Sequence, residues 1–327
     1  MDSLVNTVTL AFATAQQWLY ESIFQPLLFK LGFGNLLEDG YAATGWLLVG
    51  LLQIAVLVLV IGPLQRWKPV EPVTDRATVG TDILYTLIHR LGLFRVALFF
   101  AIDPLLDDLF GLLRVQGFSG FQLDNLWPGV TDKAAFSFLI YLVALDFLDY
   151  WVHRAQHQFN WWWSLHSLHH AQRQMTMWSD NRNHLLDDLI RDVILVLVAQ
   201  CIGVAPAQFV AIVAFTQLSE NFQHANLRVW FGSVAERLWV SPRFHRLHHA
   251  IGIGHETVKD GKTVLGGHNF GVLLPWWDML FGTANFELRY DPTGVRDQVE
   301  PVNGQLRDYG RGFWSQQWLG VLRLFGR

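Results

Sequence analysis

The chain has 327 residues, of which 51% are hydrophobic and 16% charged, whereas an ordinary soluble domain has about 25% charged residues. Its formal net charge of −4 provides no basic surface for nucleic acid, so we expect no nucleic-acid partner. The single cysteine, Cys201, excludes an internal disulfide framework and a thiolate metal cluster. The 15 tryptophans are typical of a protein with side chains at a membrane interface.

The first part of the chain carries the predicted membrane spans. Residues 1–40 are predicted to form an amphipathic lead-in on the membrane, and their lack of a positive start leads us to expect no cleavable signal peptide. The run 41–65 is uncharged and long enough to cross about 30 Å of hydrocarbon as a helix. Further crossings are predicted near 80–102 and 134–151. We therefore expect transmembrane helices within 41–152.

The region 153–290 is predicted to be a histidine-rich, metal-binding catalytic region. Within it, 189–218 is apolar but interrupted by Gly203 and Pro206, which favours a membrane hairpin of two short helices or one kinked helix. The tail 291–327 ends in a segment that combines aromatic and aliphatic side chains with arginines, which predicts an interfacial amphipathic helix.

The Lys and Arg residues predict the orientation. Of the 24 such residues, 16 follow Trp151, and cytoplasmic segments of membrane proteins are enriched in them. The predicted fold class is therefore an all-α, multi-pass integral membrane helical bundle with a cytoplasmic cap of histidine-rich helices. The N-terminus and the acidic loop near 103–132 would then face the other side.

Histidines carry the chemistry of this chain. Neutral imidazole is the commonest metal ligand, and i, i+3 and i, i+4 spacings place side chains on one helix face. Eight imidazoles are too many for one ion and suit two. The predicted ligands form an HxxxH motif and two HxxHH motifs: His153 and His157; His166, His169 and His170; His245, His248 and His249.

Other polar residues are predicted to assist. His224 follows an apolar segment, as the first cluster does, and is a candidate ninth ligand. We expect His255, in a Gly-rich charged loop, to be solvated, and His89 to be a structural polar group. Further candidates, as hydrogen-bond acceptors for ligand N–H groups or as extra ligands, are Asp146, Asp149, His184, Asp187 and His268.

The three histidine motifs, in this order and with apolar runs before and between them, resemble the fatty acid hydroxylase superfamily. The segments 244–249 (FHRLHH), 269–271 (NFG) and 277–283 (WDMLFGT) are also similar to its members, and the resemblance covers about 80–285. His224 falls where members carry a further ligand. Glu220 replaces a histidine that some members have four residues earlier.

The resemblance implies an O₂-dependent di-iron enzyme that hydroxylates or desaturates a lipid, such as a fatty acyl chain or a sterol. It implies two iron ions, with zinc possible in isolated protein, and O₂ as co-substrate. No haem, flavin or nicotinamide motif is visible in the sequence, so we expect a separate electron donor, a reductase with a cytochrome or ferredoxin. The ligands alone do not choose between iron and zinc.

Two other functions fit the same residues. A zinc-dependent membrane hydrolase would use the histidines to activate water, and iron content with O₂ consumption would distinguish it from an oxidase. A metal transporter or sensor would place polar ligands within the spans, whereas these histidines mostly follow the apolar runs.

Overall fold

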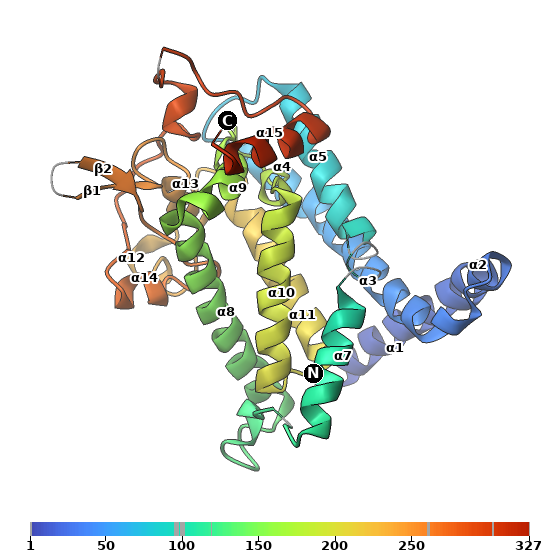
Figure 1. The fold of residues 1–327 in the computed structure, drawn as a ribbon. Coiled ribbons are helices and arrows are strands. Elements are labelled where there is room, and N and C mark those ends of the chain that lie inside the picture. Colours follow the sequence, from blue (N-terminus) through green and yellow to red (C-terminus); the bar gives the residue numbers. More distant parts are fainter. Residues whose placement is uncertain are drawn as a thin grey trace.

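The computed structural model describes residues 2–94, 98, 102–118, 120–259, 262–302 and 304–326. It is built from helices, with one small two-stranded sheet in the part described (Figure 1). The α-helices in chain order are α1 (Asp2–Leu19), α2 (Gln25–Leu31), α3 (Leu37–Val56), α4 (Gly62–Trp67), α5 (Arg76–Arg90), α7 (Asp103–Val115), α8 (Ala134–Gln158), α9 (Asn160–His170), α10 (Leu185–Ile202), α11 (Pro206–Gln223), α12 (Gly232–Ala235), α13 (Pro242–His248), α14 (Trp276–Leu280) and α15 (Phe313–Leu324). This helical architecture confirms the predicted all-α class.

Two helical stretches in the described ranges are long and apolar enough to cross a membrane. The first, Gly34–Trp67, joins α3 to α4 through a π-helical turn, η3 (Leu57–Ile61), and contains the predicted run 41–65. The second is α8, which continues beyond the predicted crossing and carries the first histidine pair near its end. Both satisfy the length and composition expected of a span.

The predicted crossing near 80–102 has weaker support. Helix α5 ends at Arg90, and its 15 residues are about 22 Å long, less than the thickness of the hydrocarbon core. Its Arg90 is buried and donates to Asn221, while Asp82 is buried against Arg182. These polar contacts turn inward, as expected of charges in an apolar bundle. Residues 95–97 and 99–101 of this prediction lie outside the described residues.

The predicted hairpin at 189–218 forms from two helices, α10 and α11. They are joined at Gly203, whose φ of 84° is the left-handed conformation that glycine adopts at a helix end. Figure 1 shows α8, α10 and α11 side by side, with the α10–α11 turn and the loop 120–133 at one end of the bundle. Their core includes Tyr141, Leu145, Leu195, Ala199 and Ile212.

The two ends of the chain lie apart. The lead-in forms α1, a π-helical segment η1 (Tyr20–Phe24) and α2, which project to one side of the bundle in Figure 1. The predicted C-terminal helix is present as α15, which packs on α9 and α5. Trp314 and Trp318 are exposed on this helix, and Phe325 is exposed directly after its end.

The histidine motifs gather at the end of the bundle opposite the α10–α11 turn. There α9 and α13 join the ends of α8 and α11, and an antiparallel hairpin of β1 (Glu256–Lys259) and β2 (Lys262–Leu265) extends outward (Figure 1). This hairpin was not predicted. Short 3₁₀ turns complete the connections: η2 (Gly34–Leu36), η4 (Leu123–Asn125), η5 (Ser179–Asn181) and η6 (Arg296–Gln298).

Candidate metal centre

The helical spacing in the sequence produces the predicted faces. His153 and His157 are buried on one side of α8, one turn apart. Helix α9 buries His166, His169 and His170. Helix α13 starts at Ser241–Pro242 as predicted, with the Ser241 hydroxyl accepting from the Phe244 N–H at 3.1 Å, and it buries His245 and His248.

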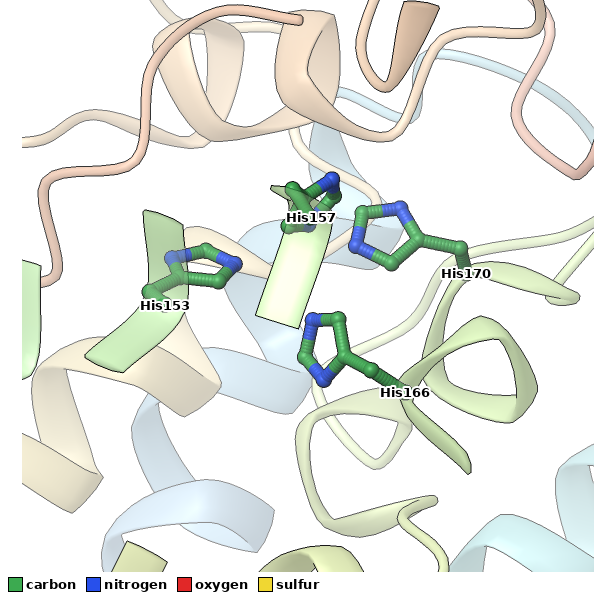
Figure 2. Close-up of side chains that lie close together, drawn as sticks. All are labelled: His153, His157, His166 and His170. Atoms are coloured by element: carbon green, nitrogen blue, oxygen red, sulfur yellow. The ribbon is translucent and has the colours of Figure 1, made fainter. Parts of the chain in front are cut away.

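All nine predicted ligands come together, eight of them in two adjoining groups of four. One group contains His153, His157, His166 and His170, whose rings surround one central space (Figure 2). The other contains His169, His224, His245 and His249. His248 lies with His170 and His249, between the two. Within each group the candidate ligand atoms are all within 4.8 Å of one another, a spacing compatible with one ion in each group.

The nitrogens of the second group point at one another. The Nε2 atom of His224 lies 3.1 Å from Nε2 of His169 and 3.0 Å from Nε2 of His245, which in turn lies 3.1 Å from Nε2 of His249. Neutral imidazoles can share at most one proton along each of these contacts. Four such atoms facing one point are the arrangement that a metal ion stabilises.

Buried nitrogens without partners test the fit of a metal. Burying a polar group without a hydrogen bond is unfavourable, so nearly all such groups in proteins have partners. Here both ring nitrogens of His157 and of His170 are buried without a protein partner, as are Nε2 of His166 and of His248. The residues present therefore fit metal ions, which would bind these atoms.

Hydrogen bonds to the opposite ring nitrogen orient several of the imidazoles. His153 Nδ1 lies 2.9 Å from the Phe270 carbonyl, and His248 Nδ1 lies 2.7 Å from the His268 carbonyl. His166 Nδ1 lies 2.9 Å from Asp187, whose other oxygen accepts from Gln156 and Trp162. Such partners fix the tautomer and direct Nε2 toward a metal.

Burial also keeps the cluster in its ligating form. The pKa values of His169, His170, His245 and His249 lie well below the usual 6.5. The main cause is desolvation by burial, and the second is repulsion between neighbouring imidazolium charges. Burial lowers the pKa of His248 to about 3. These rings are therefore neutral at physiological pH, and neutral imidazole is the form that binds metal.

Among the predicted assisting residues, Asp187 contacts a cluster histidine directly through its side chain. Asp149 pairs with Arg191 at 3.0 Å and faces the same cavity as His153. Asp146 does not hold a ligand N–H as proposed from sequence. It accepts instead from the Leu273 and Leu274 N–H groups and from the Trp277 indole, because the chain after Phe270 folds back onto α8.

The remaining histidine candidates lie outside the two groups. His184 caps α10, where its Nδ1 accepts from the Leu186 N–H, and its Nε2 contacts the Gln317 carbonyl of α15. His268 contributes its carbonyl to His248, while its ring lies 3.3 Å from the Ile253 carbonyl. His89 lies 3.3 Å from Asp188, which agrees with the predicted structural role.

The prediction that His255 is solvated is wrong. Its side chain is 1% exposed, and its ring stacks on Trp163 at 5.2 Å and lies 5.6 Å from the His170 ring. The chain closes tightly here, since a side chain at Gly254 would overlap the His248 carbonyl. Trp163 also contacts the His157 ring at 5.0 Å. Sequence analysis missed this contact, because the strands that bring His255 inward carry no strong signal.

A small polar cavity borders the second group. It has room for about 50 Å³ and is lined by His169, His224 and His245, and also by Arg191 and Glu220. Glu220, which stands in place of a further histidine, accepts from Arg191 at 3.2 Å. The cavity is of the size that holds a small molecule such as water.

The fold and this site define a helical protein with a buried, all-histidine centre that could hold metal ions. Residues 138–283 match the family model described as fatty acid hydroxylase. The matched residues contain the three histidine motifs, so this part of the chain is similar to a fatty acid hydroxylase domain, as the resemblance seen in the motifs predicted.

The curated relatives of the chain include proteins named as a lipid hydroxylase and as alkylglycerol monooxygenases. It is 26% identical over 258 residues to ornithine lipid hydroxylase OlsE of Rhizobium tropici, which covers 78% of this chain and 73% of the relative. It is 24% identical to alkylglycerol monooxygenase of Homo sapiens over 82% of this chain and 54% of the relative. It is 27% identical to alkylglycerol monooxygenase of Caenorhabditis elegans, over 45% of this chain and 26% of the relative. The chain thus spans about half or less of those two monooxygenases, and no solved structure matches it significantly.

Proposed function

We propose that the protein is an O₂-dependent, di-iron membrane oxidoreductase that hydroxylates or desaturates a lipid. The observation that carries this proposal is the pair of buried histidine groups, with ring nitrogens facing one another and lacking other partners. The relatives named as a lipid hydroxylase and as monooxygenases supply the reaction class and the lipid substrate.

Iron is proposed because the reaction needs a redox metal. The donor set is nitrogen alone, which suits iron, zinc, copper or nickel, but zinc does not change oxidation state. When bound, two irons would supply O₂ activation and oxidation of an unactivated C–H bond. Hydroxylation balances as R–H + O₂ + 2 e⁻ + 2 H⁺ → R–OH + H₂O, with electrons from a separate reductase acting through a cytochrome or ferredoxin.

The chain's own residues position and protect the centre. The nine clustered histidines would hold the ions, and Asp187 fixes the orientation of His166 through its 2.9 Å contact. Burial excludes bulk water, which would otherwise compete for the metal and for reactive species. The polar cavity beside His169, His224 and His245 offers a place for a small co-substrate such as O₂.

The proposed location is an integral, multi-pass membrane protein with the centre on the cytoplasmic side. The two long apolar stretches and the excess of Lys and Arg after Trp151 support this. The substrate is then a lipid of the same bilayer, either a fatty acyl chain, a sterol or a related molecule.

The test is to express the gene in cells and to compare their lipids by mass spectrometry with those of cells carrying an inactive copy. A product heavier by one oxygen indicates hydroxylation, and one lighter by two hydrogens indicates desaturation. Purified protein should contain two irons per chain and should consume O₂ when substrate and reductant are present. Zinc content with lipid cleavage and no O₂ uptake would instead identify a hydrolase.

A further inference from the structure

An exposed apolar surface lies beside α8, away from the metal centre. It is formed by side chains of α12, α14 and the segments next to them, and we name it the α12–α14 patch. Its members are Val234, Leu238, Trp276, Met279 and Leu280. Val234 is 73% exposed and Leu280 is 68% exposed. The two segments are joined by the hydrogen bond from the Val240 N–H to the Leu273 carbonyl at 3.0 Å. Apolar residues scattered singly on a surface are ordinary, but exposed apolar side chains from segments joined in this way mark a contact with another body.

The inner side of the patch is firmly anchored. The Trp277 indole donates to Asp146 at 2.8 Å, and its ring lies 4.8 Å from Phe147. The Phe281 ring stacks on Tyr150 at 5.5 Å and contacts Trp151 at 4.9 Å. Helix α14 is therefore attached along residues 146–151 of α8, and its outer side chains are held pointing away from the protein.

The charges around the patch select the kind of partner. The two acidic residues within it are buried: Glu236 is paired with Arg243 at 2.6 Å, and Asp278 accepts from backbone N–H groups. Arg237 remains exposed at the surface, and Arg154 lies over the Trp151 ring at 5.4 Å. Apolar and aromatic side chains with basic neighbours fit the interfacial zone of a bilayer that contains anionic lipids.

The position of the patch agrees with that partner. Helix α8 is one of the two stretches long and apolar enough to cross a membrane, and α14 is attached partway along it. Figure 1 shows α12 and α14 beside α8, nearer to its middle than the β1–β2 hairpin is. A membrane that surrounds the first part of α8 therefore reaches the patch and leaves the hairpin in water.

We propose that the α12–α14 patch inserts into the headgroup and upper acyl region of the bilayer, with phospholipid as its occupant. The histidine-rich region is then partly embedded and is not a cap wholly in water. His153 follows Trp151 by two residues, about 3 Å along the helix axis. The metal centre thus begins just above the lipid surface, where a substrate can reach it without leaving the bilayer.

Depth-dependent quenching tests the proposal without relying on activity. In a background with Cys201→Ala, single cysteines replace Leu280, Val234 or Val258 and carry an environment-sensitive fluorophore. Val258 on β1 is the matched control, because it is a 73% exposed apolar side chain outside the patch. Each labelled protein is reconstituted in vesicles of phosphatidylcholine and phosphatidylglycerol and exposed to iodide in the water or to phospholipid brominated along its acyl chains.

Labels at 280 and 234 should be quenched by brominated lipid and protected from iodide by several-fold relative to the label at 258. Equal iodide quenching at all three positions would overturn the proposal. Protection from iodide without quenching by brominated lipid would also overturn it, because the patch would then be covered by protein, such as a second copy of the chain. Metal content, equal in the three labelled proteins, confirms that each is folded.

Discussion

At the scale of single residues, the hydrogen bond on one imidazole nitrogen decides which nitrogen is left for a metal. His166 and His248 each use Nδ1 on an oxygen of the protein, which leaves Nε2 buried and without a partner. His224 likewise places Nδ1 2.8 Å from the Glu220 carbonyl and directs Nε2 at His169 and His245. The protein therefore selects the tautomers in advance of metal binding.

Replacing His169 or His248 by Ala should abolish turnover while the protein remains folded in the membrane. Each change removes a nitrogen from one of the histidine groups, whereas the apolar helices satisfy their own backbone hydrogen bonds. Substrate-dependent O₂ uptake and iron content should be measured for both variants. His268→Gln is the matched control, because its ring lies outside the groups and its carbonyl is retained. Full activity in either Ala variant would contradict the di-iron proposal.

Asp187→Asn should weaken metal binding by about 10–100-fold, the usual effect of losing a partner of a ligand histidine. The carboxylate accepts from Gln156, Trp162 and His166. The NH₂ group of an asparagine is a donor, so at this position it would face another N–H donor and form no hydrogen bond with it. Asp188→Asn changes a neighbouring buried carboxylate whose near partner is His89, and should retain the metal. Competition with a chelator measures both affinities; equal loss in the two variants would argue against a specific role for Asp187.

At the scale of elements, the spacing of residues along the sequence predicts which side chains share a helix face, provided that one helix contains the whole motif. The i, i+3 and i, i+4 pattern predicted the faces of α8, α9 and α13, and Ser241–Pro242 predicted the start of α13. Spacing along one helix cannot reveal which later segment will fold over it. Asp146 shares a face with His153, yet its partners come from residues 273–277, which is why its role differs from the prediction.

Asp146→Ala should destabilise the attachment of α14 to α8. The change leaves two backbone N–H groups and an indole N–H buried without their acceptor, each costing about 1–3 kcal/mol. We expect a fall of several degrees in the thermal unfolding midpoint in detergent, together with weaker metal binding, because the same segment carries the Phe270 carbonyl that orients His153. Asp124→Ala, at the opposite end of α8, should lower the midpoint without changing metal affinity. Unchanged stability in the Asp146 variant would contradict this account.

At the scale of the whole molecule, the sequence predicts the helical class and the meeting of the three motifs, because eight imidazoles at helical spacing have few alternative explanations. It does not predict contacts made by weakly patterned segments. His255 becomes buried because a short hairpin and the close approach at Gly254 bring it against Trp163. The same limit applies to α5, within the expected crossing near 80–102, because its buried polar groups are paired with distant residues such as Arg182 and Asn221.

The two ends of the bundle should face opposite sides of the membrane. Leu126, which is 74% exposed, lies in the loop at the start of α8, and Lys259 lies in the hairpin beyond the histidines. Because α8 is long and apolar enough to cross, single cysteines at these positions in a Cys201→Ala background should react with an impermeant maleimide from opposite sides of sealed vesicles. The excess of Lys and Arg after Trp151 predicts that position 259 faces the cytoplasm. Permeabilised vesicles, in which both cysteines should react, provide the control; labelling of both from one side of sealed vesicles would refute the crossing by α8.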